Sequence, residues 1–250
     1  MKRPRTGHAR LVLPLLRQTV ETWTLESGAF LLYGLFMLVA SLVVGQLPLV
    51  GLVLALAVEG PLAGGLVLAT RRVLLQERPE REDFLGGFTG IRRSLELSTL
   101  ALIVPTLGLG SWLATSASAP WLQAHGLTWA VSLVALPGVA LTLAAAWFFA
   151  VSSQVLLLEQ VPVGRSLRVS WGLVRRRPFA VAALLILFAV LQFLLALPTL
   201  LAMLAQHEPT LMQWLPLLLG MLLLSPFQGI LGTLLYFRLR DEGSITHAQG

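Results

Sequence analysis

Long apolar stretches interrupted by short charged segments run through the whole chain. Three of these stretches, 28–70, 94–164 and 178–237, contain no lysine or arginine. Because a helix needs about 20 apolar residues to cross a hydrocarbon core, each stretch is long enough for a pair of crossings. The pattern therefore predicts six membrane-spanning helices, at about 29–47, 49–70, 97–115, 127–151, 179–203 and 212–237.

The charged segments between these stretches carry a different pattern. Apolar residues recur there at helical spacing opposite a charged face, over about 10–27, 82–96 and 163–177. Short basic amphipathic helices of this kind lie in the plane of the lipid headgroups. We therefore expect one all-α domain over residues 1–250, a polytopic membrane helix bundle with cytoplasmic interfacial helices. Each interfacial helix precedes a pair of spans, so a threefold internal repeat remains an open interpretation.

Composition narrows the class of protein further. Apolar residues make up 56% of the chain and charged residues 12%, and the mean hydropathy is +0.80. An ordinary soluble domain has roughly twice that share of charged residues. These values exclude a soluble globular enzyme, a disordered chain and a nucleic-acid-binding domain, despite a net charge of +6. The sequence has no cysteine, which excludes disulfides, thiolate nucleophiles and cysteine-bound metals.

The distribution of positive charge predicts the orientation of the chain. All 18 lysine and arginine residues fall outside the three apolar stretches. With six crossings, every one of them lies on the same side of the membrane. Because positive charge is retained on the cytoplasmic side, we expect both termini to be cytoplasmic.

Three polar side chains fall inside predicted spans: Glu59, Gln192 and Gln228. Glu59 lies twelve residues before Arg71, which is about 18 Å along a helix and close to the middle of the bilayer. A carboxylate at that depth costs on the order of 2.5–3.5 kcal/mol on insertion scales. Glu59 is therefore either a proton or substrate site, or a structural carboxyl group that hydrogen-bonds Gln192, Gln228 or backbone freed by Pro61.

Proline and glycine recur at matching places in the second and sixth predicted spans. Pro61 and Gly64 have the same spacing as Pro226 and Gly229. Broken helices at corresponding positions can mark the binding site of a transporter, although proline is also common in ordinary membrane helices. Gly60 and Gly64 form a Gly-x-x-x-Gly pair, which we expect to pack inside the bundle.

Arginines in and beside the interfacial helices form a second group of candidate site residues. Positive charge sets the topology, but the run at 175–177 exceeds what topology needs. We expect these side chains to contact anionic lipid headgroups, and the same surface is open to a protein partner. The candidates are Arg92, Arg93, Arg165, Arg168, Arg175, Arg176 and Arg177.

The sequence lacks the motifs of intramembrane catalysis. It contains no Gly-x-Ser-x-Gly, His-Glu-x-x-His or Walker A pattern, and its two aspartates, Asp83 and Asp241, lie outside the predicted spans. His125, His207 and Glu208 could face a metal from the outer side, but they lack the spacing of metal ligands. We therefore expect no catalytic residue, no metal and no cofactor.

Short motifs near the second span, the third interfacial helix and the C-terminus carry a family resemblance. They are Glu59-Gly60-Pro61-Leu62 with Arg71-Arg72, Glu77-Arg78-Pro79 and Asp83-Phe84, then Gly164-Arg165-Ser166-Leu167 with Ser170-Trp171 and Arg175-Arg176-Arg177-Pro178, and finally Leu234-Leu235-Tyr236-Phe237-Arg238-Leu239-Arg240-Asp241-Glu242-Gly243. Together they resemble a bacterial family of six-span integral membrane proteins of unknown function. That family is related to the membrane domain joined to some glycerophosphodiester phosphodiesterases. The resemblance implies a setting beside lipids in the bacterial inner membrane, and it carries over no catalytic residue.

Two functions remain open at this point. The first is a non-enzymatic accessory or scaffold protein whose basic helices contact anionic lipids. The alternative is a transporter of a small solute or lipid, or a permease subunit, that uses Glu59. A transporter needs a hydrated path to Glu59, whereas a scaffold packs that residue dry.

Overall fold

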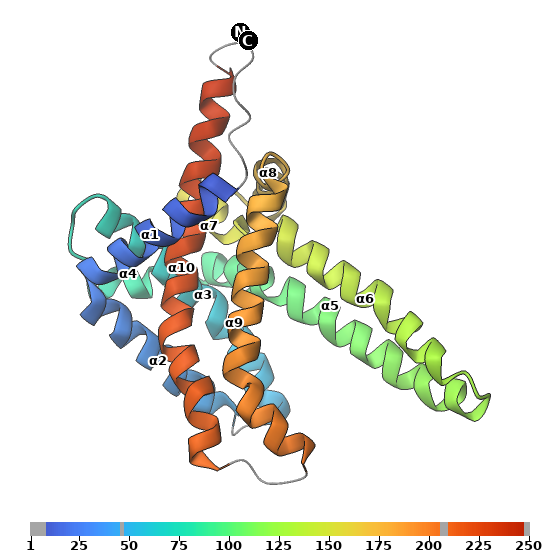
Figure 1. The fold of residues 1–250 in the computed structure, drawn as a ribbon. Coiled ribbons are helices and arrows are strands. Elements are labelled where there is room, and N and C mark those ends of the chain that lie inside the picture. The colour runs from blue at the N-terminus through green and yellow to red at the C-terminus, as the bar shows by residue number, and fades with distance from the viewer. Residues whose placement is uncertain (1–8, 46–47, 206–209, 248–250) are drawn as a thin grey trace.

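Helices account for the regular structure of the described part of the chain. The computed structural model describes residues 9–45, 48–205 and 210–247, and within these ranges it contains no strand. The all-α class predicted from the sequence is therefore confirmed (Figure 1). In chain order the elements are α1 (Ala9–Leu25), α2 (Ser27–Gly45), α3 (Pro48–Leu74), α4 (Arg81–Leu85), the short 3-10 helix η1 (Gly86–Phe88), α5 (Ile91–Ala124), α6 (Thr128–Phe148), α7 (Ser152–Leu158), α8 (Val163–Val174), α9 (Pro178–Leu204) and α10 (Leu211–His247).

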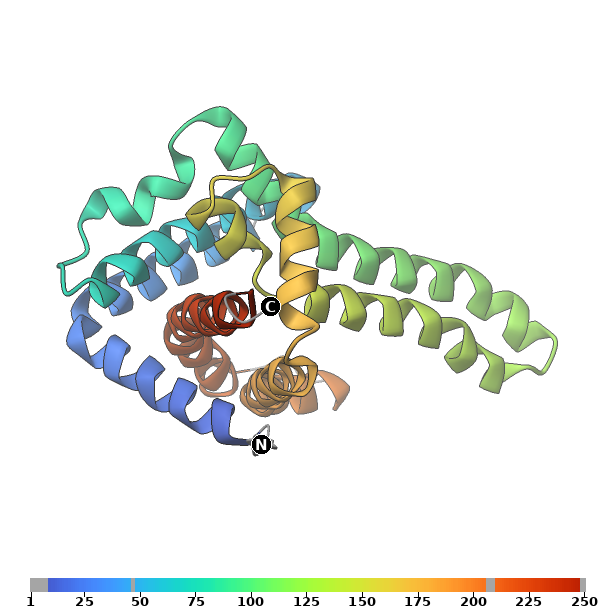
Figure 2. The ribbon, with the colours of Figure 1, turned by 90° about the horizontal axis from the view of Figure 1, so that it is seen from above.

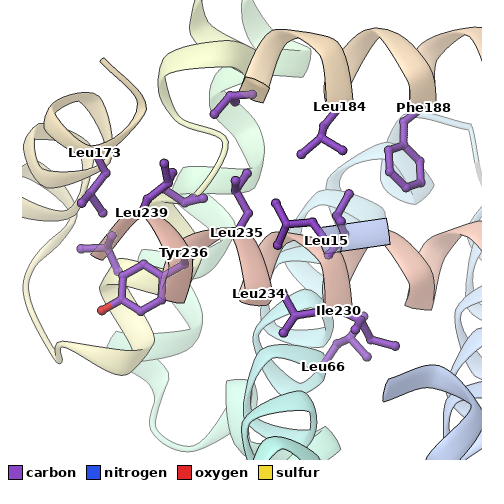
Figure 3. Packing of buried hydrophobic residues seen from close by; sticks show 14 of the residues in the cluster. Leu15, Leu66, Leu173, Leu184, Phe188, Ile230, Leu234, Leu235, Tyr236 and Leu239 are labelled. Carbon is purple, nitrogen blue, oxygen red and sulfur yellow. The ribbon is translucent and has the colours of Figure 1, made fainter. Parts of the chain in front are cut away.

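The last helix, α10, is the centre of the fold. Side chains from α1, α2, α3, α7, α8 and α9 form one apolar cluster around it. Ile230 and Tyr236 of α10 are completely buried, and Leu15, Leu66 and Leu184 lie around them from three other helices (Figure 3). A helix can be surrounded in this way when it is apolar on all sides, as α10 is over residues 229–237 apart from the buried Thr233.

Helices α5 and α6 form an antiparallel arm that leaves the bundle. They pack along each other and diverge from α9 and α10 in both views (Figures 1 and 2). Large apolar side chains cover the outside of the arm, and Trp112, Trp121 and Trp129 are 62%, 61% and 63% exposed. Apolar surface of this extent on long helices is typical of contact with lipid.

Four helical stretches in the described residues are long and apolar enough to cross a membrane. They run over Ile91–Ala124, Trp129–Leu158, Pro178–Ala202 and Met212–Asp241. Helices α1 and α2 meet at 94° and add a fifth crossing if the bent pair counts as one span.

The prediction of six spans is therefore corrected to four or five. Helix α3, which covers the predicted span 49–70, is not among the candidate crossings found in the described residues. The described side chains of α3 run only over 58–74, which is too short a stretch to count as a crossing, and they include Glu59, Arg71 and Arg72.

Two predicted boundaries are wrong for local reasons. Residues 82–96 do not form one amphipathic helix, because the chain turns at Gly90 with a φ of +85° that glycine adopts without strain, and α5 begins immediately after it. The third span, expected to end near 115, continues to Ala124 through Pro120. Pro120 removes one backbone donor without ending the helix, and the turn falls instead at Gly126, with a φ of +72°.

The short helix α7 was not predicted at all. The span expected to end at 151 ends at Phe148, and α7 follows it as a separate buried element. Val155 and Leu156 of α7 are completely buried between the bundle and the start of the arm. The helix therefore belongs to the core, although it begins with the polar residues Ser152, Ser153 and Gln154.

The charged segments gather at one end of the molecule, which we call the basic end. It comprises α1, α4, α7, α8, the start of α5 and the last turns of α3 and α10 (Figure 1). Helix α8 is seen almost end-on in Figure 1 and from the side in Figure 2, so it runs across α9 and α10. The Ser170 hydroxyl donates to the Phe148 carbonyl oxygen at 2.9 Å, and Trp171 stacks on the Phe148 ring, which holds α8 in this orientation.

Candidate functional site

A pocket of about 400 Å³ lies between α2, α3, α9 and α10, and we call it the Glu59 pocket. All three polar residues singled out in the predicted spans line it: Glu59 from α3, Gln192 from α9 and Gln228 from α10. Ser225 adds a hydroxyl group that sequence analysis did not select, one helical turn before Gln228 on the same face of α10. The rest of the lining consists of leucine, methionine, alanine and glycine.

The polar groups of the Glu59 pocket do not bond to one another. Within the described residues, no hydrogen bond or ion pair involves Glu59, Gln192, Ser225 or Gln228, and Glu59 is exposed. A purely structural role for the Glu59 carboxyl group would require a hydrogen bond to Gln192, to Gln228 or to nearby backbone. The described structure contains no such hydrogen bond. A few convergent polar groups in a mostly apolar cavity are typical of a small-molecule site.

Glycine allows α3 to approach α5 closely beside this pocket. A Cβ atom at Gly60 would lie 2.5 Å from the carbonyl oxygen of Leu97, and one at Gly64 would lie 2.8 Å from Leu97 Cδ1. Pro61 is buried between them, and its carbonyl oxygen lies where a side chain at Gly87 would stand. The Gly-x-x-x-Gly pair thus faces α5 and η1 of the same chain.

Pro226 and Gly229 hold α10 against its neighbours. Pro226 is buried, and a Cβ atom at Gly229 would overlap the side chain of Leu66 on α3. On the α2 side, a Cβ atom at Gly34 would overlap the backbone carbonyl group of Leu222. These close approaches fix the three helices that form most of the pocket wall.

The candidate headgroup arginines divide into two groups. Arg93 donates to the Leu156 carbonyl oxygen at 3.0 Å, Arg92 pairs with Glu96 at 3.2 Å, and Arg177 also has an interaction within the protein. These three arginines therefore have structural contacts. The side chains of the other four are exposed and form no hydrogen bond or ion pair within the described residues: Arg165, Arg168, Arg175 and Arg176.

A charged cluster that sequence analysis did not identify ties α4 to α3. Arg72 lies 2.9 Å from Glu80, 3.0 Å from Asp83 and 4.0 Å from Glu77. The hydrogen bond that the Arg72 guanidinium donates to Glu80, together with the negative charge of Asp83, raises the pKa of the Arg72 guanidinium above its usual value. The alternation of acidic and basic residues over 77–83 could have indicated an ion-pair network, but not its partner at Arg72.

A second cluster ties α7 to α10. Glu159 accepts a hydrogen bond from the Tyr236 hydroxyl at 2.9 Å and pairs with Arg240 at 3.0 Å, while Arg240 also contacts the Tyr236 hydroxyl. Glu159 and Tyr236 are 77 residues apart, so no local pattern could have indicated this contact. The cluster fixes the end of α10 at the basic end.

Metal-ligand clusters are absent from the described residues. No group of three or more His, Asp or Glu side chains there is placed to hold a metal ion. The Nδ1 atom of His125 lies 2.8 Å from the carbonyl oxygen of Trp121 in the preceding turn of helix. His207 and Glu208 lie outside the described residues.

The Glu59 pocket combines one carboxyl group, two amides and one hydroxyl group with an apolar wall. Glu59 is the one charged residue among the described residues that line the pocket, so the pocket is suited to a ligand that donates hydrogen bonds or carries positive charge.

Compared with known proteins, the chain matches no protein-family model, no curated protein and no solved structure.

Proposed function

We propose that this helical membrane protein binds a small polar solute in the Glu59 pocket and carries it through the bundle. The observation behind the proposal is the convergence of Glu59, Gln192 and Gln228, from three helices, on one cavity without bonds between them. A carboxyl group in a mostly apolar pocket is stabilised by a hydrogen-bond or charge partner. Because the described residues supply none, a ligand or a transferred proton is the partner that the pocket accommodates.

Charge and hydrogen-bonding capacity define the class of ligand. Glu59 offers negative charge, and the two amides and Ser225 offer both donors and acceptors. No described arginine, lysine or histidine lines the pocket to balance an anion. The ligand that fits best is a small amine or another donor-rich solute with an apolar part against the leucine and methionine wall.

The setting that we propose for this activity is the bacterial inner membrane, with the basic end on the cytoplasmic side. The concentration of arginine at that end supports this orientation. The motif resemblance to bacterial membrane proteins of unknown function supports the same setting. The protein acts as a binding and transport protein in this proposal, without catalysing a reaction.

Native mass spectrometry of the protein released from lipid nanodiscs tests the proposal. We expect wild-type protein to retain a small amine-bearing or donor-rich solute, and the Glu59→Gln variant to lose it, because the amide removes the negative charge. Glu82→Gln is the matched control, since Glu82 is exposed on α4 and has no partner in the described residues. Equal retention of the same solutes by Glu59→Gln and by wild type would contradict the proposal.

An accessory or scaffold function is the second candidate. The observation that favours it is the exposure of Arg165, Arg168, Arg175 and Arg176 on and beside α8 without partners in the described residues. Such a surface is suited to anionic lipid or to an acidic protein partner. Co-purification of one defined protein, lost when Arg165 and Arg168 are both changed to Gln, would favour this function over solute transport.

A further inference from the structure

A second pocket, of about 520 Å³, lies at the basic end between α1, α3 and α10. Arg71 from the last turns of α3 and Arg238 from α10 both line it, and we call it the Arg71–Arg238 pocket. Gln18 of α1 and Asp241 of α10 complete its polar lining. Neither arginine is among the headgroup candidates of the sequence analysis, and they lie 167 positions apart in the sequence.

The two arginines are free to bind an anion. Both are exposed, and neither side chain forms a hydrogen bond or ion pair within the described residues. The neighbouring charges are already engaged: Arg17 pairs with Glu21 at 2.8 Å beside Gln18, and Arg240 pairs with Glu159. Asp241, the one acidic residue of the lining, has an interaction of its own within the protein. The two arginines therefore leave positive charge in the pocket for an anionic ligand.

The remaining wall of the pocket is apolar. Leu74, Leu75, Leu234 and Phe237 line it, and Leu75 is 59% exposed. Arg238 stands at the end of the candidate span Met212–Asp241, at the level where a membrane helix meets the headgroups. An anion that binds here therefore has apolar surface directly beside it. A phospholipid needs such a surface, because acyl chains are attached close to its phosphate.

We propose that the Arg71–Arg238 pocket binds the phosphodiester headgroup of an anionic phospholipid, with its glycerol and upper acyl carbons against Leu75 and Phe237. The guanidinium groups donate to the phosphate oxygens from two different helices, which is the geometry that arginine provides well. This site is separate from the Glu59 pocket and does not depend on the solute-binding function proposed above.

Lipid retention in native mass spectrometry tests the site. Wild-type protein is released from nanodiscs of phosphatidylcholine that contain a minor fraction of phosphatidylglycerol. We expect it to retain phosphatidylglycerol in preference to phosphatidylcholine, and Arg71→Gln/Arg238→Gln to lose that preference by roughly tenfold or more. Each single variant is expected to show part of the loss, which keeps the test available if the double variant does not fold.

A charge-matched control separates a built site from general attraction to the basic end. Arg175→Gln/Arg176→Gln also removes two exposed, unpaired arginines from that end, but outside the pocket, so we expect it to retain phosphatidylglycerol. Equal loss in both double variants, or no loss in Arg71→Gln/Arg238→Gln, would overturn the proposal.

A soluble competitor separates a lipid headgroup from a free phosphate. Glycerol phosphate is added to protein in nanodiscs of phosphatidylcholine alone, and we expect little binding because it lacks the acyl carbons that contact the apolar wall. Arginine-dependent binding of glycerol phosphate as strong as that of phosphatidylglycerol would show that the ligand is a soluble phosphate, and would overturn the assignment to lipid.

Discussion

Gly60 decides how closely α3 approaches α5. Three backbone atoms of Leu97 and Ser98 lie 2.5–2.7 Å from the position that a Cβ atom at Gly60 would occupy. Backbone atoms inside a helix cannot turn aside as a flexible side chain can. Any side chain at this position therefore forces the two helices apart, beside the residue that supplies the pocket carboxyl group.

We expect Gly60→Ala to destabilise the protein by about 1–3 kcal/mol, the usual cost of overpacking a close contact. Gly172→Ala is the control, because Gly172 is exposed on α8 and no atom lies within 4 Å of its Cβ position. Alanine there is neutral or stabilises the helix by up to about 1 kcal/mol. Thermal unfolding of both variants in the same detergent is the measurement, and equal melting temperatures would refute the packing role of Gly60.

Sequence reasoning at this scale identified residue types better than partners. The Gly-x-x-x-Gly spacing predicted close helix packing, but not that Leu97 would stand opposite Gly60. The three polar residues of the Glu59 pocket were identified because polar side chains are rare in membrane helices. Their convergence could not be predicted, because helices that are apolar on every side show no preferred face from which neighbours can be inferred.

Helix α4 is the shortest α-helix of the described structure, and it depends on Arg72. Its five residues are too few to form a stable helix alone. Pairing of Arg72 with Glu80 and Asp83 anchors its first turn to the end of α3, and Phe84 stacks on Tyr33 of α2. Electrostatic and aromatic contacts thus hold it from two sides.

We expect Arg72→Gln to increase backbone hydrogen exchange over Arg81–Leu85 while leaving exchange in the buried part of α10 unchanged, because only the local anchor is lost. Arg78→Gln serves as the control. Arg78 is 94% exposed and lies 4.0 Å from Glu26, so removing its charge changes little. Unaltered exchange over Arg81–Leu85 in Arg72→Gln would show that Phe84 packing alone holds the helix.

Element boundaries were predictable where proline or a change of pattern marks them. Helix α8 begins after Pro162 and α9 begins at Pro178, where proline is suited to a helix start. Helix α7 was not predicted, although it begins with the polar residues Ser152, Ser153 and Gln154, because its apolar part is too short to stand out as a helix. The break at Gly90 was missed because the apolar spacing of 82–96 continues across a turn that reverses the chain.

At the scale of the whole molecule, apolar length and charge distribution account for the architecture. Four or five candidate crossings, an exposed apolar arm and a basic end are the arrangement expected of a protein surrounded by lipid. The predicted number of crossings is higher because the sequence counted α3 as a span, whereas α3 is not a candidate crossing in the described residues and α1 with α2 gives one only as a bent pair. The Glu59 pocket depends on the way α2, α3, α9 and α10 surround a common space, which only the folded chain shows.

The hydration of the Glu59 pocket is the most direct test of this account, and the absence of cysteine from the chain makes it simple to measure. Gln192→Cys places a thiol in the pocket, and Phe193→Cys places one at nearly the same depth on the outside of α9, where Phe193 is 57% exposed. A membrane-impermeant thiol reagent attacks the thiolate, which forms in water and not in hydrocarbon. We predict rapid labelling of Gln192→Cys and little labelling of Phe193→Cys in proteoliposomes with the reagent on both sides. Equal labelling of the two variants, or no labelling of Gln192→Cys, would contradict a solute-binding pocket at Glu59.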